Sequence, residues 1–421
     1  MRRVLLIVPW DPEKGHNARA GNLLRQFARD GVETTLLCQA TNSSYTPADI
    51  IRNSLSWRVS TSRDSHSTTI TVDPFLNYAP GLRADCQQEA MYGRPQALRR
   101  LLIRGLAPLG LLRDMACFLS LWFYAWTRLR GTFDWCLGFD AGGALVGWLL
   151  KQVGKVRMLV YEDQDYGPMG GYLRQRCIAT LERFLVRRAD LVISVGHRLA
   201  SLRRSQAAKQ SYVVHNGVAL RLFETARQRP PHPPTLLFVG NLSPWDGLDL
   251  TIEALPVLRK TIAQIRLLVV ADGSPAYTER LRRTVATLGL SDVVQFLGPK
   301  QHHELPSVFR QADIGLAHFQ PVPFRVFSFP LKVLEYMTSG LPVIGTVDTE
   351  AGDLVQRCEC GLAIPFTTSA LAEAVCSLLL DEERYERYRT NGIKHSQEFA
   401  WPALFKQEYD LIATRYSSIS S

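Results

Sequence analysis

The feature that most constrains the fold is a proline-rich stretch at residues 226–234, which separates two series of alternating apolar runs and amphipathic segments. A helix cannot continue through these prolines, because proline lacks a backbone N–H and its ring clashes with the preceding turn. Each series has the pattern typical of a parallel sheet covered by helices. A chain of 421 residues is also too long for one ordinary hydrophobic core. We therefore predict two α/β domains joined near this stretch.

The first series predicts a parallel sheet in the N-terminal half. A buried strand at 4–8, a helix that starts near residues 16–17 and stops at Gly31, and a strand at 32–38 form a βαβ unit. Further strands are predicted at 134–139, 158–161, 190–195 and 212–214, with a helix at 181–188. Residues 40–95 show only weak alternation.

The second series predicts another parallel sheet after the proline-rich stretch. Strands are predicted at 236–239, 265–270, 293–297, 313–317 and 342–346, with helices at 248–258 and 370–380. Ligands of such sheets bind at the carboxyl ends of the strands. We expect the loops that follow these strands to carry the functional residues.

One helix of the second series is defined by both of its ends. Pro330 suits the first helical turn, where its missing N–H costs nothing, and Gly340 suits the left-handed position after the last turn. Three apolar residues at helical spacing are expected to face the core: Leu331, Leu334 and Met337.

The start of this helix has the features of a nucleotide-sugar site. Its free N–H groups near Pro330 and Lys332 offer a place for a phosphate. Glu335 lies at the edge of the apolar face, where a carboxylate accepts hydrogen bonds from sugar hydroxyls. The alternatives are a solvated lysine and a surface glutamate.

The net charge of +10, from 49 basic and 39 acidic residues, favours an anionic partner. Nucleic acid, an acidic membrane surface and a phosphorylated substrate all fit the charge. No nucleic-acid-binding motif accompanies it, so we expect no nucleic acid partner.

The eight cysteines are scattered, which argues against a disulfide framework, and Cys358 and Cys360 lack the second pair expected of a zinc site. The apolar run at the N-terminus ends at Pro9 and suits a first strand better than a secretory signal. A cytoplasmic location is expected.

Residues 97–130 are both basic and apolar. The twelve uncharged residues from Met115 to Trp126 are too few to span a bilayer. Two interpretations stay open, a core helix with solvated ends and a helix that lies on an anionic membrane. The second predicts peripheral attachment to the cytoplasmic face of the inner membrane.

Several segments resemble the retaining glycosyltransferases of the GT-B fold, in the large group 1 (family 4) class that acts on bacterial polysaccharides. The segments that carry the resemblance are Gly15-His16, Ala189 to Val195, Val214 to Val218, Phe238 to Gly247, Ala312 to Leu316 and Phe329 to Met337. The match is specific over residues 185–415 and looser over 1–39 and 134–165.

The resemblance implies two Rossmann-like, doubly wound domains that face each other across a cleft. Residues 1–228 would form the acceptor-side domain and residues 229–398 the nucleotide-sugar domain. Residues 399–421 would form a helix that crosses back to the N-terminal domain.

The resemblance also implies a set of donor-binding residues in the C-terminal half. They are Gly240, Asn241, Gly298, Lys300, Pro330, Leu331, Lys332 and Glu335. The base would lie near 298–300, the ribose on Glu335 and the diphosphate against 330–332.

On the acceptor side, Gly15 would lie in a loop that closes over the diphosphate, and His16 and Asp140 are the candidate catalytic residues. His16 could instead cap its helix. The resemblance implies no metal and no cofactor. The run 162–165 looks like the Asp-x-Asp metal motif of another fold, and Asp163 or Asp165 could contact acceptor hydroxyls.

The chain departs from the family at three positions. The arginine and lysine that usually bind the diphosphate are replaced by Asn241 and Asp246, and the first glutamate of the usual pair is replaced by Phe327. Losing two charge-assisted hydrogen bonds would weaken donor binding by roughly a hundredfold to ten-thousandfold. Compensating cations are expected from Lys332 above all, or from Arg325 or Lys300.

The predicted function is retaining, metal-independent transfer of a hexose from a UDP- or GDP-sugar to a saccharide acceptor, plausibly lipid-linked, in the biosynthesis of polysaccharide or glycolipid. Two alternatives stay open at this stage. One is a sugar-nucleotide 2-epimerase of the same fold. The other is a non-catalytic partner in a glycan-assembly complex.

Overall fold

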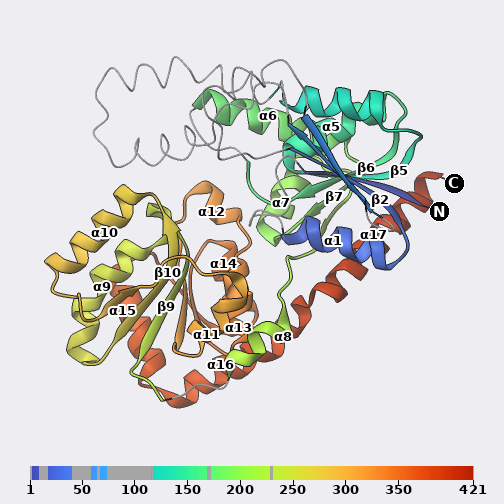
Figure 1. The fold of residues 1–421 in the computed structure, drawn as a ribbon. Helices are drawn as coiled ribbons and strands as arrows, with labels where there is room; N and C mark the ends of the chain where they lie inside the picture. Colours follow the sequence, from blue (N-terminus) through green and yellow to red (C-terminus); the bar gives the residue numbers. More distant parts are fainter. Residues whose placement is uncertain are drawn as a thin grey trace, which may run out of the picture. The chain divides into compact units, whose positions relative to one another are not determined.

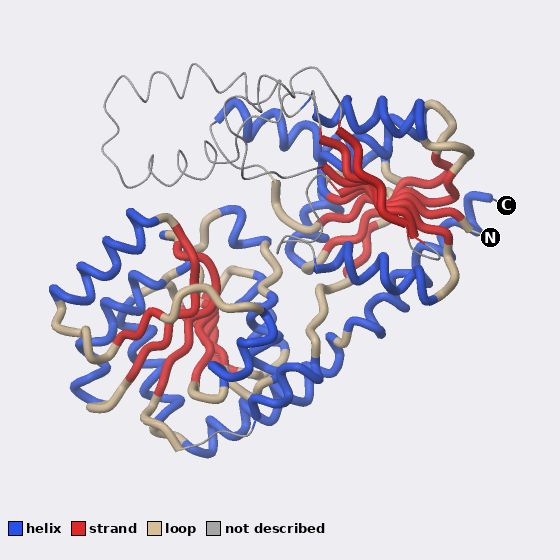
Figure 2. Tube along the Cα trace, in the orientation of Figure 1, coloured by secondary structure: helices blue, strands red, loops and turns tan. Residues whose placement is uncertain are grey.

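The chain divides into two compact units, each built around its own sheet (Figures 1 and 2). The structure, a computed structural model, describes residues 2–8, 18–39, 58–63, 67–73, 115, 117–167, 172–227 and 231–420. One unit comprises Met1–His215 and Phe405–Ser421, and the other comprises Asn216–Leu404. The chain thus divides after residues 215 and 404, whereas the sequence placed the boundaries at 228 and 398. The proline-rich stretch lies within the second unit.

The first unit holds an eight-stranded sheet of order β3-β4-β2-β1-β5-β6-β7-β8. Only β3 runs antiparallel to its neighbour. The strands are β1 (Arg3–Val8), β2 (Glu33–Gln39), β3 (Arg58–Arg63), β4 (Ser67–Asp73), β5 (Phe133–Phe139), β6 (Val156–Asp163), β7 (Leu191–Ser194) and β8 (Ser211–Val213). The helices are α1 (Ala18–Arg29), α5 (Asp140–Gln152), α6 (Tyr172–Arg188), α7 (His197–Ser205) and, from Phe405 on, α17 (Trp401–Ser420). Helices cover both faces, with α5 and α6 on one face and α1 and α17 on the other (Figure 1).

The second unit holds a six-stranded, fully parallel sheet of order β11-β10-β9-β12-β13-β14. The strands are β9 (Thr235–Leu242), β10 (Arg266–Gly273), β11 (Val294–Phe296), β12 (Ile314–Ala317), β13 (Val343–Thr346) and β14 (Gly361–Ile364). The α-helices are α8 (Leu220–Glu224), α9 (Leu248–Thr261), α10 (Pro275–Thr287), α11 (Leu305–Phe309), α12 (Pro323–Phe327), α13 (Leu331–Thr338), α14 (Glu350–Arg357), α15 (Thr368–Leu379) and α16 (Glu382–Ser396). Short 3-10 turns lie at η1 (Thr225–Arg227), η2 (Pro244–Asp246), η3 (His302–Glu304) and η4 (Gln397–Phe399).

The strands expected from the apolar runs are present, within a few residues at each end. The β3–β4 hairpin and β14 were not predicted. Strand β4 extends the sheet beside β2, and its side chains are mostly half-buried, so it lacks the continuous apolar run of the central strands.

The C-terminal helix α17 is part of the first unit through specific contacts. The Tyr409 ring packs edge-on against Trp135 at 5.4 Å between ring centroids. The Tyr416 hydroxyl donates to Asp134 Oδ1 at 2.8 Å, and Arg415 Nε donates to the Asp190 carbonyl at 3.1 Å.

The helical backbone at residues 117–128 packs one face into the core of the first unit, through Cys117, Leu121 and Ala125. Its other face exposes Leu119, Phe123 and Trp126, each more than two-fifths accessible to solvent. The two interpretations of this segment therefore apply to different faces of one helix. Residues 97–114 lie outside the described residues. Within the described part of the chain, no helix combines the length and apolar character that a membrane crossing requires.

Candidate functional site

Most of the predicted donor-binding residues lie at the carboxyl end of β9 and in or just before α13, whereas Gly298 and Lys300 follow β11. Lys332, in the first turn of α13, is half-buried, and its Nζ lies 4.9 Å from the ring centres of Phe238 and Phe319. A Cβ built on Gly240, at φ +148°, would lie 2.8 Å from this Nζ. Glycine at 240 therefore lets the ammonium group reach the end of β9.

Burial lowers the pKa of Lys332 to about 8. The nearby carboxylate of Asp246 opposes this change, and the guanidinium of Arg325 adds to it. Burial thus weakens proton binding by this lysine, and an anion placed beside it would favour its charged form.

Asp246 is buried directly after β9, at 2% exposure. Its carboxylate accepts hydrogen bonds from Ser243 Oγ and from Arg325 Nη2. The Arg325 guanidinium lies 4.8 Å and 5.2 Å from the ring centres of Phe319 and Phe324. Asp246 stands where the resemblance led us to expect a lysine. In the structure it is paired with Arg325 of α12.

Glu335, the predicted ribose ligand, already has a partner within the chain. His302 Nε2 lies 3.0 Å from Glu335 Oε1, and the His302 ring packs edge-on against Phe223. The hydrogen bond to Glu335 raises the pKa of His302. Sequence reasoning missed this pairing, although the helix-capping pattern of Gln301 and Glu304 marks the turn that carries His302.

The remaining predicted donor residues differ in their settings. Pro330 is the extended residue before α13 rather than part of its first turn. Leu331 was expected to face the core, but 38% of it is exposed, and Val333 is buried instead. Gly298 has φ +71°, and Asn241 and Lys300 are exposed.

A neutral histidine supports the turn between β9 and α9. His318 Nε2 lies 2.9 Å from both the Gly247 carbonyl and Thr251 Oγ1. Burial lowers the pKa of His318 to about 4, so the ring is uncharged at neutral pH. The sequence did not predict this role, because nothing in the pattern around a single histidine after a strand indicates its distant partners Gly247 and Thr251.

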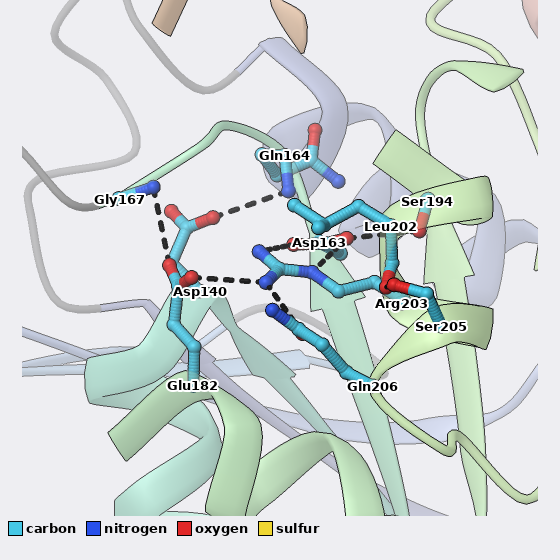
Figure 3. Close-up of polar contacts among 10 residues, drawn as sticks. All are labelled: Asp140, Asp163, Gln164, Gly167, Glu182, Ser194, Leu202, Arg203, Ser205 and Gln206. Carbon is cyan, nitrogen blue, oxygen red and sulfur yellow. Dashed lines mark hydrogen bonds and ion pairs between the residues drawn. The ribbon is translucent and has the colours of Figure 1, made fainter. Parts of the chain in front are cut away.

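In the first unit, Asp140 occupies the carboxyl end of β5. It has φ +50°, a conformation that few non-glycine residues adopt, and its Oδ1 accepts a hydrogen bond from the Gln164 amide at 3.1 Å (Figure 3). Burial, reinforced by the neighbouring carboxylates of Asp165, Asp163 and Glu182, raises the pKa of Asp140 well above its ordinary value. A carboxyl group in this setting binds a proton more readily than an ordinary aspartate.

Arg203 neutralises the carboxylates behind Asp140 (Figure 3). Its Nε and Nη2 donate to the two oxygens of Asp163 at 2.9 Å and 2.8 Å, and Nη1 donates to Glu182 Oε2 at 2.9 Å. Ser194 Oγ adds a hydrogen bond to Asp163. Asp163 is fully buried, so the expectation that it might contact an acceptor hydroxyl is wrong, whereas Asp165 is exposed. The described residues contain no group of carboxylate, histidine and cysteine side chains arranged for a metal ion.

A second buried arginine holds α17 in the first unit. Arg19 pairs with Glu162 at 3.1 Å and with Glu408, and it donates to the Val214 and His215 carbonyls. Burial raises the pKa of both glutamates. Arg19 lies just after the predicted loop residues Gly15 and His16, which are outside the described residues.

Comparison with known proteins places this arrangement in a family. A protein-family model described as "Glycosyl transferases group 1" matches residues 223–395. The matched residues include Lys332, Arg325 and Glu335. Residues 223–395 therefore carry a group 1 glycosyltransferase domain. The chain is 27% identical over 292 residues to the D-inositol 3-phosphate glycosyltransferase of Corynebacterium glutamicum (strain R), an alignment that covers 62% of this chain and 68% of the relative.

Solved structures show how this group 1 glycosyltransferase is folded. A sucrose-phosphate synthase from Thermosynechococcus elongatus matches with a TM-score of 0.73 at 20% identity, over 99% of this chain and 100% of that one. HepE of Anabaena, in complex with UDP, matches with a TM-score of 0.68 at 17% identity, over 98% and 100%. These likenesses confirm the GT-B fold that the sequence predicted. The binding roles of the individual residues stay predictions.

Proposed function

We propose that this glycosyltransferase transfers a hexose from a UDP- or GDP-sugar to a saccharide acceptor, with retention of anomeric configuration, in the synthesis of polysaccharide or glycolipid. The observation that carries the proposal is the half-buried Lys332 beside the first turn of α13. Free amide N–H groups and an ammonium group together suit the diphosphate that leaves in the reaction. UDP in HepE, a structural neighbour, agrees with such a ligand.

The chemistry proposed here is stabilisation of the leaving group and positioning of both substrates. Lys332 would balance the charge that develops on the diphosphate, and Glu335 would accept hydrogen bonds from the ribose hydroxyls. Asp140 would orient the sugar or the acceptor through its raised-pKa carboxyl group. A donor phosphate oxygen would take the proton from the acceptor hydroxyl, as in a front-face attack.

A metal is not needed in this proposal, because side-chain and helix-end charges would stabilise the diphosphate. Transfer measured after removal of divalent cations with EDTA should proceed at the untreated rate. A loss that added magnesium or manganese restores would contradict this part of the proposal.

The test of the main proposal is transfer itself. The purified chain is incubated with UDP- and GDP-sugars and a membrane lipid extract, and glycosylated product and released nucleotide are both measured. Glu335→Ala should weaken nucleotide binding by about tenfold. Isomerised donor in the absence of acceptor would indicate an epimerase, and a chain that binds neither UDP nor GDP would indicate a non-catalytic partner.

We propose in addition that the acceptor is lipid-linked and that the enzyme works on the cytoplasmic face of the inner membrane. The exposed Leu119, Phe123 and Trp126 share one face of the 117–128 helix, and the exposed Arg128 and Arg130 follow it. Apolar side chains flanked by arginines suit the surface of an anionic bilayer. Co-sedimentation with phosphatidylglycerol vesicles should fall when Phe123 and Trp126 are both replaced by serine, and no change in sedimentation would contradict the membrane assignment.

A further inference from the structure

Asp246 places a carboxylate where the resemblance led us to expect a lysine. A buried carboxylate costs free energy unless a cation or several hydrogen bonds accompany it. Asp246 is 2% exposed, and it obtains both kinds of partner, from Arg325 and from Ser243. The substitution has therefore not simply removed a cation, because it coincides with a cation recruited from α12.

Arg325 retains hydrogen-bonding capacity after this pairing. A guanidinium group has five N–H donors. One of its terminal nitrogens donates to Asp246, and its Nε is buried with no hydrogen-bond partner among the residues that the structure describes. A buried donor without a partner costs free energy, so this side chain is placed to bind something more than the aspartate.

Arg325 and Lys332 form a pair of cations around one aromatic ring. The Arg325 guanidinium carbon and Lys332 Nζ lie 4.8 Å and 4.9 Å from the centre of the Phe319 ring. Their mutual repulsion contributes to the lowered pKa of Lys332. The carboxylates of Asp246 and Glu335 offset part of this positive charge, and an anionic ligand beside the two cations would favour the charged form of the lysine.

We propose that Arg325, held in place by Asp246, is the second cation that binds the diphosphate of the nucleotide-sugar. In this arrangement the chain has replaced a cation on the loop after β9 with an aspartate that orients a cation from α12. Asp246 is a positioning residue, since it acts through Arg325. The inference deepens the proposed function and depends on it.

The experiment compares nucleoside diphosphates with nucleosides by isothermal titration calorimetry. The full-length chain is titrated with UDP, GDP, uridine and guanosine. Arg325→Ala should lower the affinity for the diphosphate by roughly 10- to 150-fold and leave the affinity for the nucleoside unchanged. Arg259→Ala, which removes an exposed arginine paired with Asp292, is the matched control and should leave both unchanged.

Three further variants separate a loss of binding from a loss of folding. The double variant Asp246→Asn with Arg325→Ala removes both charges, so no unpaired carboxylate stays buried, and it should show the same loss. For the positioning role, Asp246→Ala should lose several-fold in diphosphate affinity, and Asp246→Asn, whose amide oxygen can still accept from Arg325, should recover most of it. If Asp246 and Arg325 had only a structural role, these variants would change the affinity for the diphosphate and the affinity for the nucleoside alike.

The outcomes are distinguishable. If the wild-type chain binds UDP or GDP and the double variant binds it equally well, the role of Arg325 is overturned and the proposed function stands. If the wild-type chain binds no nucleoside diphosphate, the proposed function fails, and this inference fails with it.

Discussion

The two units treat buried arginine and lysine side chains in opposite ways. In the first unit, Arg203 is fully buried and donates to two carboxylates. In the second unit, Lys332 and Arg325 lie beside aromatic rings and share one buried carboxylate, that of Asp246. In the first arrangement one cation faces two carboxylates and needs no ligand, whereas in the second two cations share Asp246, and the carboxylate of Glu335 acts on Lys332 in addition. The comparison teaches that burial of a cation does not by itself mark a binding site, and that the balance of its counter-charges is the better guide.

The largest expected effect is a loss of stability on removing Arg203, the partner of Asp163 and Glu182. Arg203→Ala would leave Asp163 and Glu182 buried without their cation, which should lower the free energy of unfolding of the first unit by about 3–5 kcal/mol. Urea denaturation followed by circular dichroism measures it. Arg183→Ala, at an exposed position on α6 next to Glu182, is the control and should change stability by less than about 0.5 kcal/mol. Equal stability of the two variants would break the comparison.

Lys332→Gln should show the opposite result to Arg203→Ala, with stability retained and nucleotide affinity lost. It removes a desolvated cation, so the free energy of unfolding should not fall, while affinity for UDP or GDP should fall by roughly 10- to 150-fold. Thermal unfolding and calorimetric titration measure the two quantities. Lys260→Gln, an exposed lysine near the end of α9, should change neither. A large loss of stability in Lys332→Gln would show that the lysine is structural.

The pH dependence of diphosphate affinity also tests whether Lys332 contacts the anion. Since the pKa of Lys332 is lowered to about 8, affinity for the diphosphate should decline as the pH rises through about 8. The stability of the ligand-free second unit should rise over the interval between about 8 and the ordinary lysine pKa near 10.5, because the unfolded chain binds the proton more tightly there. Lys332→Arg keeps its charge over this range, so its affinity should stay level between about pH 7 and 9. A wild-type profile as flat as that of this variant would argue against contact between Lys332 and the anion.

The smallest effect is expected at His302. Its raised pKa means that the ion pair with Glu335 contributes stability below the ordinary histidine pKa of 6.5, and that this contribution is lost as the pH rises through the raised value. Because 57% of the His302 side chain is exposed, His302→Gln should change nucleotide affinity by less than about fivefold. His303→Gln, also exposed, is the control for titrations at about pH 6 and 8. A much larger change would make His302 a direct ligand of the nucleotide.

Much of the fold was predictable because central parallel strands are continuous apolar runs. Strands β1, β9 and β13 are buried along most of their length and end at loop or turn residues, so the printed sequence marks them. Strands β3 and β4 form the outer end of their sheet and are polar and half-exposed, and this composition resembles that of a loop.

The candidate site was predictable only where it is local in sequence. Lys332 and Glu335 share a helix whose proline and glycine ends are visible in the sequence. The pairing of Asp246 with Arg325 joins residues 79 positions apart, and that of Arg203 with Asp163 joins residues 40 apart, so no periodicity reports them. Seen in sequence alone, Asp246 is a lost cation, and only the structure shows what it holds.

The return of α17 to the first unit has a consequence for biogenesis. A ribosome releases Glu408 only after the whole of the second unit has been synthesised, and until then the guanidinium of Arg19 lacks one of its two counter-ions. The nascent N-terminal portion therefore cannot reach its final packing ahead of the rest. A stop codon between codons 404 and 408 would leave Arg19 without Glu408, even though every strand of both sheets had been translated.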